Sequence, residues 1–125
     1  MTSGIKEPEL RLVVIRTLEV ERLAAFYRCV GIQFAEEQHG TGSRHLAAEL
    51  SDAVVEIYPA KMLEDVDRTT RLGFSVSDVH AAIKALETFG AEIVVQPKQT
   101  EWGLRAVVKD PDGRTVELYA SDTVV

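Results

Sequence analysis

Two short segments of similar sequence each place one carboxylate among apolar neighbours. They read VVEIYPA at residues 54–60 and RTVELYA at residues 114–120, and their central acids are Glu56 and Glu117. Side chains alternate between the two faces of a strand, so each Glu shares a face with the tyrosine two residues later. Two carboxylates facing one cleft can bind a divalent cation, act as bases, or accept hydrogen bonds from a basic side chain. The choice among these depends on the elements that position them.

An internal repeat indicates how the two Glu-containing strands are positioned. The segment LVVIRTLEVERLAAFYRCVG at 12–31 aligns without a gap with RLGFSVSDVHAAIKALETFG at 71–90. Each copy begins with strand-like alternation and continues with apolar residues at i, i+3, i+4 and i+7, the spacing of an amphipathic helix. Ser77 or Asp78 is expected to cap the second helix, and Gly90 suits the left-handed residue that ends it.

Three further strands are expected after each helix. In the first half they lie at about 33–37, 44–50 and 53–58, and in the second at about 92–96, 104–109 and 115–119, with the strong turn signal DPDG before the last. Each half is therefore βαβββ. We predict one α+β domain over 1–125, with module 1 at about 10–60, a polar connector at about 60–70 and module 2 at about 71–120. Two such modules can form a curved, incomplete eight-stranded barrel-like cleft.

Strand parity in the first module selects the side chains that face the cleft. If the apolar residues at 55 and 57 pack under a helix, Glu56 and Tyr58 point away from it. A tight turn at 51–52 would pair Ala47 with Glu56, which adds His45 to the same face. On the opening strand the same rule adds Arg16.

In the second module, a turn confined to DPDG would place Ala106 opposite Glu117. That register predicts Trp102, Leu104 and Val108 on the cleft side, with Trp102 available to stack on a flat ligand or to close the core. The candidate ligand-binding residues are Glu56, Arg71, Glu117, His45, Tyr58, Trp102 and Arg16.

Composition excludes several classes of function. The net charge of -6 argues against binding to a phosphate backbone, and no apolar run approaches the roughly 20 residues of a membrane span. A single cysteine, Cys29, fits a reducing cytoplasm, and the first ten residues lack the apolar segment of a secretion signal. We therefore expect a cytoplasmic protein that binds neither nucleic acid nor membranes.

The sequence resembles the vicinal oxygen chelate superfamily, which includes glyoxalase I, bleomycin-resistance proteins and extradiol dioxygenases. The resemblance rests on the βαβββ repeat, on FYRCVGIQF after the first helix, on WGLRAVVKDPDGRTVEL near the end, and on a Glu near the end of each half. It covers about residues 10–120. It implies the cleft-forming fold and pairing of two chains as a homodimer.

The resemblance also implies four positions for metal ligands, one on the first and one on the last strand of each half. Here these positions hold Leu12, Glu56, Arg71 and Glu117. Leucine has no lone pair to donate, and arginine is a protonated donor with no acceptor atom. We therefore expect no metal cofactor, and we expect Arg71 to bond to one or both carboxylates where relatives hold an ion.

These observations favour a metal-independent protein that binds a small molecule, either a drug or a metabolite; whether it catalyses a reaction stays open. One alternative is a lyase, isomerase or dioxygenase that holds Zn, Ni, Mn or Fe through Glu56, Glu117 and a third ligand such as His45. Another is a metal-free enzyme in which one of the two Glu residues is the base and Arg71 is the electrophile.

Overall fold

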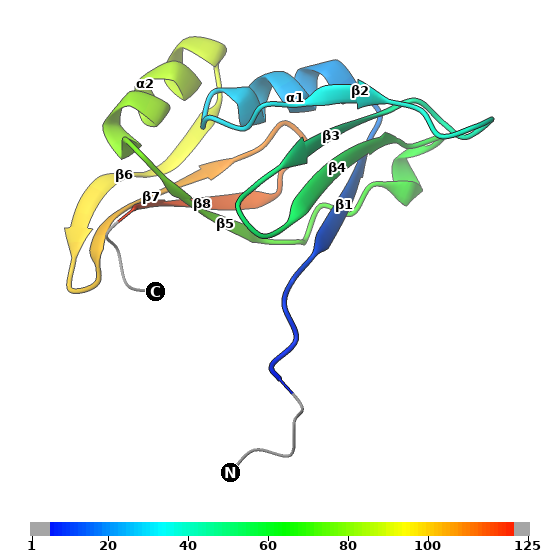
Figure 1. Ribbon diagram of the computed structural model, residues 1–125. Helices are drawn as coiled ribbons and strands as arrows, with labels where there is room; N and C mark the ends of the chain where they lie inside the picture. Colours follow the sequence, from blue (N-terminus) through cyan, green and yellow to red (C-terminus); the bar gives the residue numbers. More distant parts are fainter. Residues whose placement is uncertain (1–5, 122–125) are drawn as a thin grey trace.

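The computed structural model describes residues 6–121, and these form the two predicted βαβββ modules (Figure 1). The first module contains β1 (Leu12–Thr17), α1 (Val20–Arg28), β2 (Ala35–Glu37), β3 (His45–Glu49) and β4 (Val54–Pro59). The second contains β5 (Leu72–Val76), α2 (Val79–Phe89), β6 (Glu92–Thr100), β7 (Gly103–Lys109) and β8 (Thr115–Ala120). A 3-10 helix, η1 (Leu63–Asp65), lies in the connector.

The strands form two four-stranded sheets, with orders β1-β4-β3-β2 and β5-β8-β7-β6. In each module the first and last strands pair in parallel and the other neighbours are antiparallel. Both helices lie on the same side of the two sheets, so the opposite sheet faces are left open (Figure 1). The described strands do not close into a barrel, in agreement with the incomplete cleft predicted from the repeat.

The helices form where the apolar spacing predicts them. The buried residues of α2 are Val79, Ala82, Ile83 and Leu86, which is the predicted apolar stripe. Asp78, rather than Ser77, caps α2 by accepting a hydrogen bond from the Ala81 N–H at 2.9 Å. Gly90 ends the helix with a φ of 94°, which an L side chain rarely adopts. Across residues 6–121, neither helix combines the length and apolar character that a membrane crossing requires.

The strand register of the first sheet confirms the predicted pairing. Ala47 lies opposite Glu56, and Val55 and Ile57 are buried beneath the helices. Glu56 and Tyr58 therefore point to the open side of the sheet.

In the second sheet the predicted register is wrong by one residue. Val107, not Ala106, lies opposite Glu117, because the loop contains five residues, 110–114, instead of the four of DPDG. The Asp110 N–H donates to the Arg114 carbonyl and closes this loop. Within the loop, the Gly113 N–H donates to the Asp110 carbonyl and forms a turn. Arg114 is the additional residue, and it inverts the face of every β7 side chain.

This shift corrects two of the predicted cleft residues. Val108 is fully buried and Leu104 packs against the core, so neither faces the open side. Trp102 lies in the turn between β6 and β7, where its side chain is 60% exposed. Arg105 and Val107 lie on the face of β7 beside Glu117. The predicted register had placed Leu104, Ala106 and Val108 there.

Arg114 is fully buried at the junction of the two modules. Its guanidinium donates to Asp110 at 3.1 Å, to Asp112 at 2.9 Å, and to the Arg16 carbonyl of β1 at 2.6 Å. Tyr27 of α1 donates to the same Asp110 carboxylate at 2.8 Å. Burial first, and then the Asp110 carboxylate, raise the pKa of Tyr27 far above its usual value. We call these residues the Arg114 cluster, and it ties module 2 to the first strand and first helix of module 1.

Replacing Arg114 with methionine is expected to lower the free energy of unfolding by about 3–5 kcal/mol, since Asp110 would remain buried without its cation. Tyr27→Phe removes a single hydrogen bond to a charged acceptor and should cost about 1.5–3 kcal/mol. Urea denaturation measures both. Lys84→Met on the exposed face of α2 is the control and should stay within about 0.5 kcal/mol of wild type. A loss below about 1 kcal/mol for Arg114→Met would show that the cluster does not hold the modules together.

Candidate functional site

Glu117 lies in the middle of β8 and has hydrogen-bond partners on both carboxylate oxygens. Its Oε2 accepts from Arg71 Nε at 2.5 Å. Its Oε1 accepts from Arg105 Nε at 2.8 Å and from the Tyr119 hydroxyl at 2.6 Å, and it forms an ion pair with Arg105 Nη2 at 2.7 Å. Two cations and one hydroxyl therefore surround a single carboxylate.

These contacts determine the charge of the group. Burial opposes ionisation of the Glu117 carboxyl, but hydrogen bonds from Tyr119, Arg105 and Arg71 outweigh burial and lower its pKa to about 2. The hydrogen bond to Glu117 raises the pKa of Arg105, and the same carboxylate raises the pKa of the Tyr119 hydroxyl. At neutral pH the cluster of Arg71, Arg105, Glu117 and Tyr119 thus carries one net positive charge.

A pocket of about 380 Å³ lies beside this cluster. Its lining residues are Arg71, Leu72, Gly73, Phe74, Ser75, Glu117 and Tyr119. A Cβ on Gly73 would lie 3.3 Å from a ring carbon of Tyr119, so the glycine lets the aromatic ring lie close over β5. Arg71 is 59% exposed, and within residues 6–121 neither of its terminal amino groups has a hydrogen-bond partner. The pocket thus offers an aromatic ring and two free donors in one place.

Glu56 is positioned similarly on β4 but has different neighbours. Its Oε2 lies 3.6 Å from His45 Nε2. The His45 ring stacks on Tyr58 with centroids 4.1 Å apart and an interplanar angle of 8°. The Arg16 guanidinium lies over the Tyr58 ring, with its carbon atom 5.3 Å from the ring centre. The predicted residues of the first module are therefore brought together as a group of their own.

The two groups lie on different sheets. Among the described residues, no hydrogen bond or ion pair joins Glu56 to Arg71 or to Glu117. Arg71 bonds to one of the two carboxylates, and Arg105 supplies the second cation. Sequence reasoning missed Arg105 because it treated the loop before β8 as four residues long. The sequence signal for the longer loop was Arg114, directly after DPDG, because this residue can belong to the loop and not to the strand.

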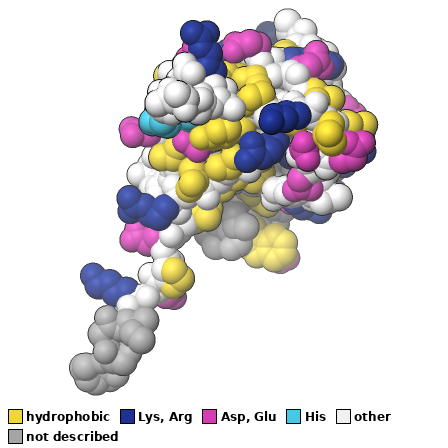
Figure 2. Space-filling view, turned by 90° about the vertical axis from the view of Figure 1, so that its right-hand side faces the viewer, with side chains coloured by type: hydrophobic (Ala, Val, Ile, Leu, Met, Phe, Trp, Pro, Cys, Tyr) yellow, Lys and Arg dark blue, Asp and Glu magenta, His cyan; other side chains and the backbone are white. Residues whose placement is uncertain are grey.

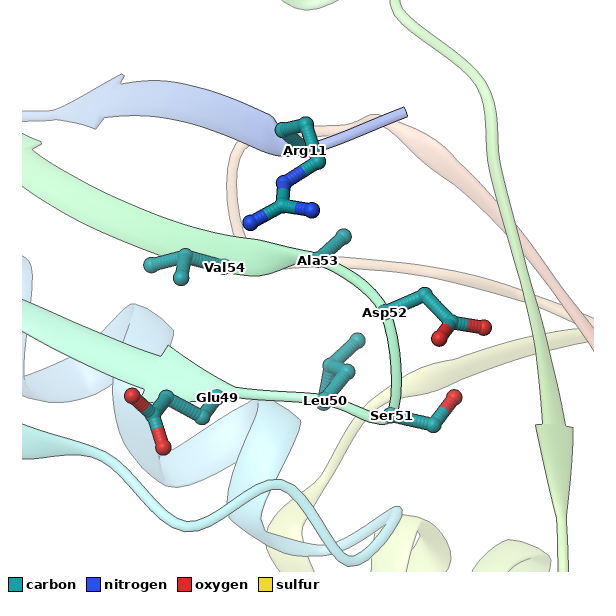
Figure 3. Close-up of a pocket in the computed structure, with 7 residues that line it drawn as sticks. All are labelled: Arg11, Glu49, Leu50, Ser51, Asp52, Ala53 and Val54. Atoms are coloured by element: carbon teal, nitrogen blue, oxygen red, sulfur yellow. The ribbon is translucent and has the colours of Figure 1, made fainter. Parts of the chain in front are cut away.

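A further pocket, of about 310 Å³, lies at the turn between β3 and β4 (Figure 3). It is lined by Arg11, Glu49, Leu50, Ser51, Asp52, Ala53 and Val54. None of the predicted site residues lines it, and it contains no aromatic side chain, so it lacks the features that fix the orientation of an organic ligand.

Comparisons with known proteins agree with this architecture. The family model described as the Glyoxalase/Bleomycin resistance protein/Dioxygenase superfamily matches residues 10–118. Among solved structures, TnmS3, an antibiotic binding protein from Streptomyces sp. CB03234, is 24% identical with a TM-score of 0.72, and the match covers 94% of this chain and 98% of that one. A glyoxalase/bleomycin resistance protein from the same organism is 25% identical with a TM-score of 0.68, covering 89% and 99%.

A more distant neighbour is a mutant of glyoxalase I from Zea mays. It is 18% identical with a TM-score of 0.71, and the match covers 88% of this chain but 44% of the longer one. At this identity the match shows the shared fold alone.

The four ligand positions implied by the superfamily do not fit a metal ion in this chain. Leu12 is an exposed hydrocarbon without a donor atom, and Arg71 places a cation next to Glu117. Both oxygens of Glu117 already accept hydrogen bonds from cationic or hydroxyl donors. The chemistry of these residues therefore does not fit the superfamily's metal ion.

Glu117 should stabilise the fold only where it is ionised. Because its folded pKa of about 2 lies below the usual 4.5, its contribution is fully present above about pH 4.5 and is lost as the pH falls towards 2. We expect Glu117→Gln to lower the free energy of unfolding by about 1–2 kcal/mol at pH 7, a value reduced for the exposure of Arg71, and the difference from wild type should vanish near pH 2.

Urea denaturation at a series of pH values measures this. Glu64→Gln, on exposed η1, is the matched control and should follow the wild-type pH profile. If Glu117→Gln and wild type lose stability in parallel on acidification, the arginine contacts do not hold the carboxylate ionised.

Proposed function

Since the chain belongs to the glyoxalase/bleomycin resistance protein/dioxygenase superfamily, we propose that it binds a small organic molecule with no metal ion in the superfamily's four-ligand position. One observation carries this proposal: Arg71 and Arg105 both donate to Glu117, so guanidinium groups occupy the place in which relatives hold a cation. Charge compensation by two arginines makes an ion there unnecessary, and the missing lone pair at Leu12 removes a ligand.

The chemistry of the pocket selects the class of ligand. The free amino groups of Arg71 are hydrogen-bond donors, and the ring of Tyr119 beside Gly73 is a flat apolar surface. Because the cluster is net positive, it complements a partial or full negative charge. A volume of about 380 Å³ lies in the range of sites for small ligands. We propose a flat aromatic molecule that carries a carbonyl, phenolate or carboxylate oxygen.

One neighbour supports a binding function. A structure with the same fold and nearly the same length is an antibiotic binding protein. The alternative of a metal-dependent lyase, isomerase or dioxygenase requires Glu117 to release its arginine partners before it could bind an ion. Its lowered pKa indicates how strongly those partners hold it.

We also propose that two copies of the chain pair through the side of β1. This strand is at the edge of its sheet, where its unpaired backbone groups are available to another strand. Most of the large apolar side chains that are exposed come from β1, its flanks and the η1 segment: Leu10, Leu12, Val14, Leu18, Met62 and Leu63. Apolar side chains are visible together on the corresponding end of the molecule (Figure 2). A partner that covers them would remove this surface from water.

Binding is tested with 1-anilinonaphthalene-8-sulfonate, a flat aromatic anion whose fluorescence rises on binding. Arg71→Ala should weaken binding about tenfold, since a hydrogen bond to a charged group is worth about 1.5–3 kcal/mol. Arg68→Ala, an exposed arginine of the connector, is the matched control and should leave the affinity unchanged.

Metal removal separates this proposal from its alternative. Dialysis against EDTA should leave the affinity for the dye as it was. Loss of binding after EDTA, restored by Zn²⁺ or Mn²⁺, would establish a metal-dependent ligand site and contradict the proposal.

The proposed pairing is tested by light scattering. Val14→Arg places a charge in the middle of the apolar surface of β1 and should convert a dimer to a monomer. Trp102→Arg changes an even more exposed apolar side chain, on the other module, and should remain dimeric. A monomeric wild type, or equal behaviour of the two variants, would exclude pairing through β1.

A further inference from the structure

A second cluster of potential metal ligands lies on the hairpin of β2 and β3, in the other sheet from Glu117 and its two arginines. Glu37 and His45 are cross-strand partners, and His39 lies in the loop that joins the two strands. The Gly42 N–H donates to the His39 carbonyl at 2.9 Å and closes a turn, with Gly40 at a φ of 58°. The turn brings the His39 ring to 5.5 Å from the His45 ring. The ligand atoms of Glu37, His39 and His45 all lie within 4.8 Å of one another.

The hydrogen bond of His45 fixes which of its ring nitrogens carries the proton. Its Nδ1 lies 3.1 Å from the Ser43 carbonyl, which only accepts, so Nδ1 carries the hydrogen. In the neutral ring Nε2 then presents a lone pair. A backbone carbonyl that accepts from the far nitrogen is the usual support of a metal-binding histidine.

Nothing in the described residues satisfies that lone pair. The His45 side chain is 1% exposed, and its Nε2 has no hydrogen-bond partner. The nearest polar atoms are two carboxylate oxygens, Glu37 Oε1 at 3.4 Å and Glu56 Oε2 at 3.6 Å. These are also acceptors. The enclosed His45 Nε2 therefore faces two carboxylate oxygens with no donor among the three atoms, and an arrangement of that kind is stabilised by a cation.

Two of the distances between these atoms match those of a tetrahedral metal site. Ligands about 2.0–2.1 Å from a tetrahedral ion lie about 3.3–3.5 Å from one another. Here Glu37 Oε1 lies 3.3 Å from His39 Nε2 and 3.4 Å from His45 Nε2. Glu56 is close enough to His45 to be the fourth ligand. Two imidazoles with carboxylate oxygens suit a borderline first-row ion such as Zn²⁺, and not Ca²⁺ or Mg²⁺, which prefer oxygen alone.

We propose that Glu37, His39 and His45 bind a divalent transition-metal ion, with Glu56 completing its coordination. The site differs from the superfamily's ligand position, of which it shares only Glu56. An ion can reach it from solvent, because His39 is 76% exposed while His45 is enclosed. Figure 2 faces the end of the molecule that carries this hairpin, and histidine (cyan) is visible there beside acidic side chains (magenta). An ion would fix the hairpin loop onto the open face of the first sheet.

The test is a calorimetric titration of the purified, tag-free chain with Zn²⁺ at neutral pH. We expect one site with an affinity of micromolar or better, and Co²⁺ substitution should give the intense visible absorption of a tetrahedral centre. His39→Ala and Glu37→Gln change exposed or half-exposed side chains, so both variants should fold, and each should weaken Zn²⁺ binding at least about tenfold. His80→Ala, an exposed histidine on α2, is the matched control and should bind as wild type does.

Three outcomes would overturn the proposal. Absence of Zn²⁺ binding would show that a proton, and not a metal, satisfies His45 Nε2. Equal losses in His80→Ala and His39→Ala would show unspecific surface binding. Loss of Zn²⁺ binding in Glu117→Gln, with no loss in His39→Ala, would place the ion at the superfamily position. That result would also contradict the proposed metal-free ligand site. If only the proposed metal site on the hairpin is disproved, the proposed ligand site still stands, because the dye titration with Arg71→Ala tests it independently.

Discussion

The burial of one arginine at the junction of the modules controls the geometry of the second sheet. An arginine cannot lose its charge in a protein, so a buried guanidinium requires acceptors within reach. Arg114 obtains them from Asp110, Asp112 and the backbone carbonyl of Arg16. To point inward it must be an additional residue of the loop before β8, and that residue sets the register of β7 against β8.

The register of β7 then determines what surrounds Glu117. With Val107 opposite Glu117, Arg105 lies on the same face and donates to the carboxylate. With the other register, Leu104 and Ala106 would have faced it instead, and Arg71 would have been the only cation beside the carboxylate. A structural interaction on the inside of the sheet thus decides the charge of a site on the outside.

The two modules are copies in pattern but have diverged in chemistry. Glu56 and Glu117 occupy equivalent positions, each two residues before a tyrosine on the last strand of its module. Around Glu117 the donors are arginines and a tyrosine, and the group carries a net positive charge. Around Glu56 the neighbour is an enclosed histidine whose Nε2 has no hydrogen-bond partner. Equivalent carboxylates on the two sheets therefore have different neighbours.

The sequence by itself determined the elements of this protein: the repeat, the helix stripes, the glycine that ends α2 and the pairing of Ala47 with Glu56 all follow from local periodicity and turn chemistry. It also determined that a leucine and an arginine occupy two ligand positions of the superfamily. It could not determine the register of β7, the partnership of Arg105 with Glu117, or the approach of His39 to Glu37 and His45. Those depend on where a loop residue points, and that direction is decided by burial and charge pairing with residues distant in sequence. Period-two alternation reports only that two faces exist, and tertiary packing decides which residues face the solvent.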